Sequence, residues 1–141
     1  MDIKQERIGE IDVKWIAGDD PGGSAIVVFH GFGASNEDLL YLSESVRAKK
    51  GTTWYFPNGI IDLAPMAQAM GAANFHGRAW WPIDGHAMNY VLQRGSYQDL
   101  SGFVPPGDND LRAKVFAMLA ELKQPFSKIT LAGFTRSNAC Y

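Results

Sequence analysis

The feature that most constrains the fold is the apolar run Ala25–Phe29, which is followed at once by the glycine-containing segment His30–Ser35. A continuous apolar run with β-branched residues is typical of a parallel strand that is covered on both faces. The glycines then predict a tight turn at the carboxyl end of this strand, where backbone N–H groups can point at an anion. The sequence therefore favours an α/β protein with a buried, mostly parallel sheet.

Two strands are predicted before the apolar run. Residues 11–15 alternate apolar and charged side chains, which is typical of a strand with one face exposed to water. The pair Gly9-Glu10 precedes them and suggests a hairpin turn back to a first strand at residues 3–8. This antiparallel pair is expected at one edge of the sheet, and the turn-forming residues 18–23 lead from it into the buried strand.

A helix and a second buried strand are predicted after the glycine turn. Ser35 and Asp38 have the spacing of a capping box, and apolar residues at helical spacing favour a helix from about Asn36 to Lys49. Residues 52–56 are rich in β-formers and end at a Pro-Asn-Gly turn. A strand, a helix and a strand in this order predict a parallel unit.

The stretch from Gly59 to about Asp84 has no sustained period and is rich in proline, glycine, methionine and aromatic residues. Long loops inside compact domains are uncommon and are often functional. Two interpretations of Trp80 and Trp81 stay open at this point. These residues line a pocket, or they close the core.

Two further helices and one strand are predicted in the last part of the chain. A short helix signal covers about Gly85 to Arg94. A clearer one begins near Asp108, presents one apolar face and ends before Pro125. Residues 127–132 then predict a strand that leads into Gly133.

The residues after this strand have the spacing of a turn that carries a nucleophile. In the G-x-S-x-G turn of serine hydrolases, glycines allow close approach and the serine hydroxyl is lifted above the sheet. This chain keeps the first glycine as Gly133, but it has Thr135 at the nucleophile position and Ser137 at the second glycine position. Threonine has a hydroxyl that can serve as a nucleophile, although its β-branch restricts the side chain and it needs an activating base.

Taken together, the segments His30–Ser35 and Leu131–Thr135 resemble the phospholipase/carboxylesterase family of the α/β-hydrolases, whose members carry an HG-x-G oxyanion loop and a GFSQG elbow. The resemblance implies a single α/β domain over residues 1–141, with a mostly parallel sheet, helices on both faces and an antiparallel N-terminal hairpin. It covers the N-terminal portion of a family member, so the sheet is expected to be truncated after the elbow strand.

The resemblance also implies roles for individual residues. The N–H groups of Phe32 and Arg136 would form the oxyanion hole, Thr135 takes the nucleophile position, and the stretch with Trp80 and Trp81 would wall an acyl pocket. The implied activity is acyl-enzyme hydrolysis of a small acyl ester or a lipid-like substrate. Because the triad acid and His follow the elbow in this family, the 141-residue chain itself is expected to be inactive.

None of the three histidines is expected to act as a catalytic base. His30 has the place of a loop-ordering residue in the resembled family, and His76 and His86 come before the elbow. The three lack the spacing of a metal motif such as H-E-x-x-H, so neither a metal nor another cofactor is expected. Asp84 is not expected to orient a base.

Composition favours an ordinary soluble domain. With 46% hydrophobic residues and a net charge of -2, the chain is long enough for one core and gives no electrostatic reason to expect nucleic acid. The charged N-terminus lacks the apolar segment of a signal peptide, and no run reaches the length of a spanning helix. We expect a cytoplasmic protein without integral membrane association, in which Cys140 has no internal disulfide partner.

Two alternatives to an esterase remain. The chain can be a non-catalytic fragment that self-associates or binds a partner, because the strand near residues 129–132 would present an unpaired edge. A nucleotide-binding domain would share the fold, but the glycine-rich phosphate motifs are absent and this alternative ranks last. The glycines of His30–Ser35 can also form a tight turn without any oxyanion role.

Overall fold

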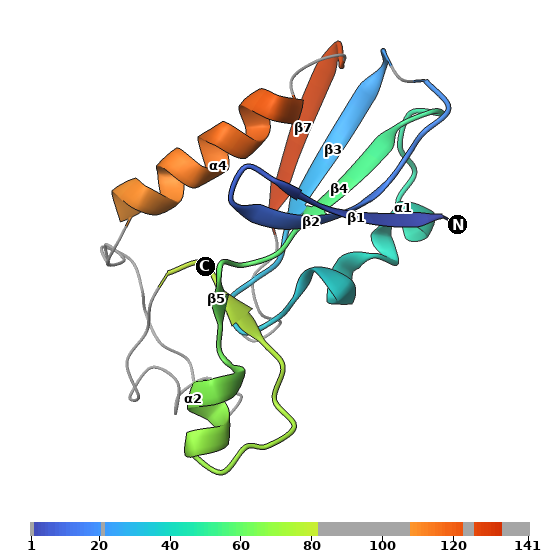
Figure 1. The fold of residues 1–141 in the computed structure, drawn as a ribbon. Helices are drawn as coiled ribbons and strands as arrows, with labels where there is room; N and C mark the ends of the chain where they lie inside the picture. Colours follow the sequence, from blue (N-terminus) through green and yellow to red (C-terminus); the bar gives the residue numbers. More distant parts are fainter. Residues whose placement is uncertain (1, 21, 82–107, 123–125, 134–141) are drawn as a thin grey trace.

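The computed structural model describes residues 2–20, 22–81, 108–122 and 126–133 of the chain. Its centre is a mixed five-stranded sheet with the order β1-β2-β4-β3-β7 (Figure 1). The strands of this sheet are β1 (Ile3–Ile8), β2 (Ile11–Ile16), β3 (Ser24–Phe29), β4 (Thr53–Pro57) and β7 (Lys128–Gly133). A mixed sheet with helices places the chain in the predicted α/β class.

β1 and β2 form the antiparallel hairpin that the sequence predicts. Ile8 pairs with Ile11, and Gly9 adopts a φ of 62° in the turn between them. This left-handed conformation is readily open to glycine because it has no Cβ. Ile11 and Val13 are buried and Asp12 is exposed, as the alternation predicts. β2 also pairs antiparallel with β4, so the hairpin lies at one end of the sheet.

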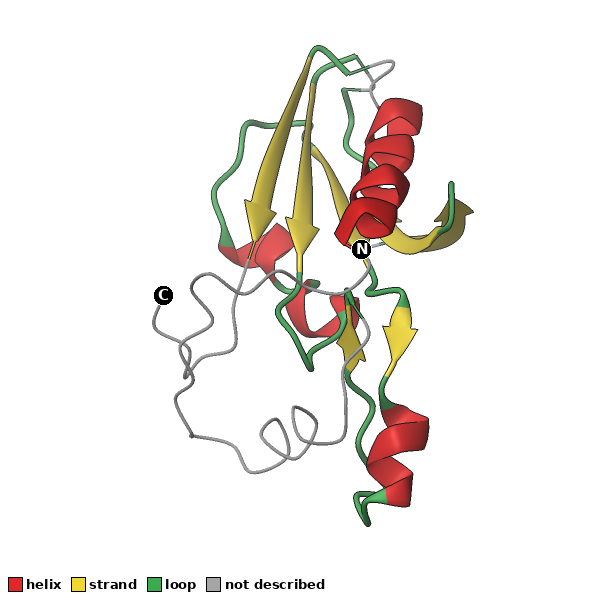
Figure 2. Ribbon diagram, turned by 90° about the vertical axis from the view of Figure 1, so that its left-hand side faces the viewer, coloured by secondary structure: helices red, strands yellow, loops and turns green. Residues whose placement is uncertain are grey.

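The other three strands run parallel. β3 pairs with β4 on one side and with β7 on the other, and the second pairing places Phe29 opposite Gly133. Parallel strands end at the same edge of a sheet, and Figure 2 shows the long strands ending side by side. Ligands of open α/β sheets bind outside the carboxyl ends of the strands, so a functional site is expected at this edge.

Apolar side chains cover both faces of the sheet. The covering helices are α4 (Asp108–Leu122) on one face and the short η1 (Asn36–Leu39) and α1 (Leu42–Ser45) on the other. Val27 shares a core with Met118 of α4, whereas the adjacent Val28 shares a core with Leu42 of α1. Both valines are buried, which confirms the prediction that this strand is covered on both sides.

α4 confirms the amphipathic helix predicted in the last part of the chain. Its buried or half-buried apolar residues are those that the sequence assigns to one face, namely Leu111, Val115, Met118, Leu119 and Leu122. Among the described residues, no helix combines the length and the apolar character that crossing a bilayer requires.

The prediction of one helix from Asn36 to Lys49 is wrong in its length, because the structure has only the two short helices η1 and α1 and the second ends at Ser45. The chain leaves the helical conformation at Val46, whose ψ is 130°. The capping contact is nevertheless present, since the Ser35 N–H donates to the Asp38 carboxylate at 2.9 Å. Helices in proteins are stabilised mainly by packing of an apolar face. The residues from Val46 to Lys49 are exposed, so no such packing extends the helix.

Residues 59–81 are more regular than their composition predicts. They contain β5 (Ile61–Asp62), α2 (Ala64–Ala69) and β6 (Arg78–Ala79), and β5 pairs antiparallel with β6 in a separate two-stranded sheet. A strand of two residues has no periodicity that a sequence pattern can reveal. The helix predicted near residues 85–94 lies outside the described residues.

Candidate active site

The loop His30–Ser35 follows β3 at the carboxyl edge of the parallel strands. The Ala34 N–H donates to the Gly31 carbonyl at 3.2 Å, which closes a four-residue turn. Gly33 takes the third position of this turn with a φ of 83°, as a type II turn requires. The predicted glycine turn is thus confirmed, and Phe32 occupies its second position.

The amides of this loop differ in their hydrogen bonding. No hydrogen bond between described residues takes up the Phe32 N–H. The three amides that follow it all have acceptors, which are the Arg78 carbonyl for Gly33 (2.9 Å), the Gly31 carbonyl for Ala34 (3.2 Å) and the Asp38 carboxylate for Ser35 (2.9 Å). The Phe32 N–H, to which the family resemblance gives the role of an oxyanion donor, therefore has no acceptor among the described residues.

His30 supports the loop from inside and is 3% exposed. Its Nε2 accepts the Gly59 N–H at 2.8 Å, and its Nδ1 lies 2.7 Å from the Gly31 carbonyl oxygen. An amide can only donate, so Nε2 carries no hydrogen and Nδ1–H donates to Gly31. Burial lowers the pKa of His30, opposed by the Gly31 hydrogen bond and the Asp38 charge and assisted by the Arg78 charge. With both nitrogens engaged, His30 orders the loop and is not a free base.

Trp80 and Trp81 have different surroundings. Trp80 is 8% exposed, its indole N–H donates to the His30 carbonyl at 3.0 Å, and its ring stacks on the His30 ring with centroids 5.0 Å apart. Trp81 is half-buried and stacks on Phe32 with centroids 5.9 Å apart. Trp80 thus supports the loop from the core, whereas Trp81 lies against the ring of Phe32. A pocket role stays a prediction for both.

Gly77 and Arg78 also hold the loop, and the sequence did not predict this role for them. The Arg78 N–H donates to the Ala34 carbonyl at 2.8 Å, and the Arg78 carbonyl accepts from Gly33. The Arg78 Nε–H donates to the Gly59 carbonyl at 2.6 Å. A Cβ on Gly77 would lie 2.2 Å from the Gly33 oxygen. The signal in the sequence was a glycine before an arginine, a pair that also occurs in ordinary turns.

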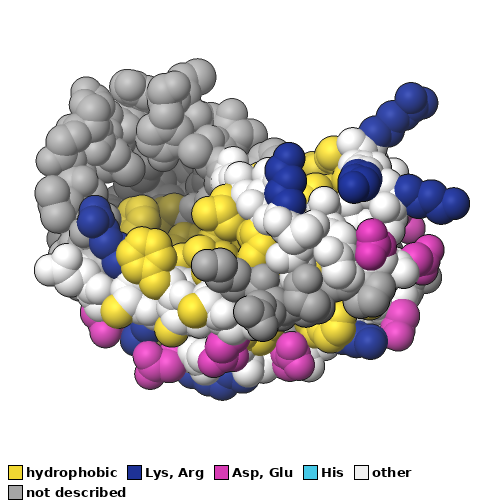
Figure 3. All heavy atoms as spheres, turned by 90° about the horizontal axis from the view of Figure 1, so that it is seen from above, with side chains coloured by type: hydrophobic (Ala, Val, Ile, Leu, Met, Phe, Trp, Pro, Cys, Tyr) yellow, Lys and Arg dark blue, Asp and Glu magenta, His cyan; other side chains and the backbone are white. Residues whose placement is uncertain are grey.

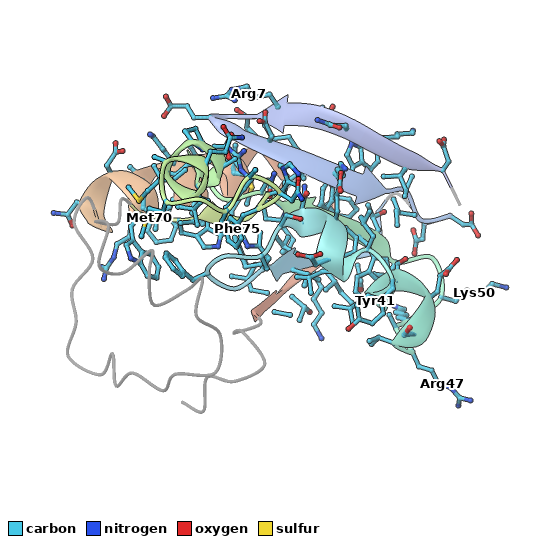
Figure 4. The ribbon with its side chains drawn as sticks, turned by 90° about the horizontal axis from the view of Figure 1, so that it is seen from below. Arg7, Tyr41, Arg47, Lys50, Met70 and Phe75 are labelled. Carbon is cyan, nitrogen blue, oxygen red and sulfur yellow. The ribbon has the colours of Figure 1, made fainter. Side chains whose placement is uncertain are left out.

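Beside the loop lies a small apolar unit, residues 60–79, which we call the apolar lobe. Its buried core consists of Leu63, Ala67 and Ala79, and Phe32 packs against it together with Met66 and Phe75. Figure 4 shows Phe75 and the exposed Met70 on this lobe. The ring of Phe32 is therefore part of an apolar surface, while its N–H has no acceptor among the residues that the structure describes.

The predicted nucleophile position follows the end of β7 in the sequence. Gly133 pairs with Phe29, one residue before His30, and a Cβ on Gly133 would meet no atom of the described part of the chain within 4 Å. Thr135 and Arg136, the predicted nucleophile and second oxyanion donor, lie outside the described residues. The chain that leads to them therefore starts at the same edge as the loop with Phe32.

In the ranges that the structure describes, no three His, Cys, Asp or Glu side chains are gathered as a metal site requires. His76 is exposed, and His86 and Asp84 lie outside these ranges. Comparisons with protein-family models, with curated proteins and with solved structures found no match. Function is therefore inferred from the loop and its neighbours.

Proposed function

We propose that this chain forms the oxyanion-binding part of a carboxylic ester hydrolase of the phospholipase/carboxylesterase type. The observation that carries the proposal is the Phe32 N–H, which has no acceptor among the described residues although the next three amides do. A fixed donor at this edge stabilises the negative charge that develops on an ester oxygen. The substrate would be a small acyl ester or a lipid-like ester.

In the proposed reaction, the Thr135 hydroxyl attacks the ester carbonyl carbon after its proton passes to a base, and the carbonyl oxygen becomes an oxyanion. The N–H groups of Phe32 and Arg136 donate to that oxyanion. The base gives that proton to the departing alcohol as the carbon–oxygen bond of the ester breaks, and water then hydrolyses the acyl-enzyme to the carboxylic acid and the free Thr135 hydroxyl. One oxyanion donor contributes a factor of about 10²–10³ to kcat in hydrolases.

The arrangement of the sheet supports this proposal. An antiparallel N-terminal hairpin beside parallel strands is what the family resemblance implies. β3 and β7 are direct neighbours, so the oxyanion loop and the chain leading to the nucleophile position leave adjacent strands at one edge. An acyl-transfer site needs donor and nucleophile to meet at one reacting carbon.

The apolar lobe provides a surface for the acyl chain in this proposal. Phe32 stacks with Trp81 and packs with Phe75 and Met66, so its ring joins the lobe, and its N–H would donate to the reacting group. Apolar surface beside a few polar groups is the usual composition of a small-molecule site. Trp81 would line the acyl pocket, and Trp80 would hold the loop.

Replacement of Phe32 by proline tests the donor directly. Proline suits the second position of a type II turn but has no N–H. Phe32→Ala is the matched control, because it removes the ring and keeps the amide. Decanoate serves as the probe, since its carboxylate stands in for the oxyanion, and tryptophan fluorescence reports binding. Loss of a charge-assisted hydrogen bond predicts a Kd at least about tenfold weaker for Phe32→Pro than for Phe32→Ala. Equal affinities would contradict the proposal.

The 141-residue chain is expected to hydrolyse p-nitrophenyl esters at a residual rate. His30 is engaged at both ring nitrogens, so it cannot serve as the base for Thr135. An oxyanion site without a working triad leaves only residual catalysis. Saturable turnover that Thr135→Ala abolishes would overturn this expectation.

A second candidate function, self-association without catalysis, is favoured by the outer part of β7. This strand has one neighbour among the described strands. Leu131 on β7 is 55% exposed and Phe116 on α4 is 66% exposed, and Figure 3 shows hydrophobic side chains gathered on the face seen from above. An unpaired strand edge with apolar neighbours is a template for pairing with a second copy.

A further inference from the structure

We propose that Gly77 and Arg78 are positioning residues that fix the orientation of the Phe32 N–H, so that the apolar lobe and the oxyanion loop act as one ligand-binding unit. The inference rests on the proposed function for the identity of the bound group, which is the carboxylate or oxyanion of an acyl compound. Its structural part, the control of the loop from a segment remote in sequence, can be tested without any ligand.

The backbone of Arg78 is bonded to the residues directly after Phe32. The Gly33 N–H donates to the Arg78 carbonyl at 2.9 Å, and the Arg78 N–H donates to the Ala34 carbonyl at 2.8 Å. Two such bonds fix both the distance and the rotation of the loop relative to β6. The same β6 backbone pairs with β5 on its other side, so it is held as part of a sheet.

The side chain of Arg78 reaches the other end of the loop through one intermediate residue. Its Nε–H donates to the Gly59 carbonyl at 2.6 Å, and the Gly59 N–H donates to Nε2 of His30 at 2.8 Å. Phe32 therefore lies between two anchor points that both lead to Arg78. Side chains locked by neighbouring hydrogen bonds hold a binding group to within a fraction of an ångström.

Gly77 allows this close approach. A Cβ at this position would lie 2.2 Å from the backbone oxygen of Gly33. A backbone atom cannot move aside as a flexible side chain can, so any larger residue has to displace Gly33 and with it the turn that carries Phe32. Glycine at a site of close backbone approach has this role in many binding loops.

The same segment connects the loop to the apolar lobe. Ala79 follows Arg78 and is fully buried in the core of the lobe, where Phe32 also packs. An acyl chain that lies on the lobe therefore contacts the unit that fixes the Phe32 N–H. We infer that tail binding and head-group binding are coupled through β6.

The test uses Gly77→Ala, with Gly22→Ala as its control because a Cβ on Gly22 would meet no atom of the described residues within 4 Å. Hydrogen exchange of the Gly33 amide in the ligand-free protein reports the bond to Arg78. Exchange at least about tenfold faster in Gly77→Ala is expected, with core amides of β3 unchanged. Decanoate should also bind at least tenfold more weakly to Gly77→Ala. The Gly22→Ala control should match the wild type in both measurements.

Arg78→Lys is the second variant, and it tests the positioning role even if Gly77→Ala does not fold. Lysine keeps the charge and the backbone but has no fixed Nε–H fork for Gly59. Severalfold faster exchange at Gly33 and severalfold weaker decanoate binding are expected. Unchanged exchange and affinity in the folded variants would overturn the positioning role. Faster exchange in the variants, combined with no carboxylate binding by the wild type, would retain the positioning role and refute the proposed function.

Discussion

β3 and β7 are paired neighbours whose side chains differ in burial. Val27 of β3 is 0% exposed, whereas Leu131, its partner in β7, is 55% exposed. The loop after β3 is fixed by hydrogen bonds from Arg78, Gly59 and Trp80. β7 contacts β3 on one side and leaves most of its side chains exposed.

This difference shows where the site is preorganised. The proposed oxyanion loop is fixed by two segments, Gly59 and residues 78–80, and none of those bonds involves β7. The conformation of the loop therefore depends on these two segments and on β3, and changes on the outer side of β7 should leave it intact.

The largest effect is expected for His30→Ala. The substitution removes a buried ring that stacks on Trp80 and leaves the Gly59 N–H without its acceptor. A cavity and a buried unsatisfied donor together predict a loss of about 3 kcal/mol in the free energy of unfolding. Urea denaturation measures this loss. His76→Ala is the control, because His76 is exposed, and an equal loss for the two variants would contradict the role of His30.

The paired residues of β3 and β7 give the next comparison. Val27→Ala should lower the free energy of unfolding by about 2 kcal/mol, since it deletes buried methyl groups between the sheet and α4. Leu131→Ala should change it by less than about 0.5 kcal/mol, as is usual for exposed positions. Urea curves of the two variants provide the test. A loss at Leu131 as large as that at Val27 would mean that the outer part of β7 is packed.

The pH dependence of stability follows from His30. Its folded-state pKa lies below its usual value of 6.5 because it is buried, so the unfolded chain binds the proton more readily. The contribution of neutral His30 is fully present above about pH 6.5 and decreases as the pH falls through the folded-state pKa. In His30→Asn, the free energy of unfolding should therefore depend less on pH in this range. Urea denaturation between about pH 5 and 8 measures this dependence. The same pH dependence in the wild type and in His30→Asn would refute the contribution of His30.

Leu131→Lys is expected to change the free energy of unfolding least. The main effect of this variant should be on self-association. A charge on the exposed side of β7 should reduce self-association through this edge, which light scattering detects. Ile129→Lys is less informative, since Ile129 is packed against the core under α4. A wild-type chain that stays monomeric at high concentration would remove the basis for the second candidate function.

The sequence predicted the elements that have a clear pattern. The hairpin from Ile3 to Ile16 and the helix from Asp108 were recognisable from periodicity, and the buried strand Ser24–Phe29 from its continuous apolar run; the structure contains all three. The glycine turn at Gly31–Ala34 followed from its composition. These features depend on local conformation and on burial of a face, both of which leave a repeat in the sequence.

What the sequence could not predict depends on contacts between distant residues. The helix after Ser35 is short because residues from Val46 onward find no packing partner, and no local pattern encodes that. The bonds from Arg78 to Gly33 and Gly59 join residues that are far apart in the chain. Strands of two residues such as β5 and β6 are too short for a period.

In the proposed function, the Phe32 N–H, which has no acceptor among the described residues, donates to the oxygen of an acyl ligand. The amide signal of Phe32, in a protein labelled with ¹⁵N at phenylalanine and titrated with decanoate, reports this bond. A saturable downfield shift of this signal is expected, which follows the tryptophan fluorescence change and is retained in Leu131→Ala. A Phe32 amide signal that stays unshifted while decanoate saturates the protein would refute the proposed role of this N–H.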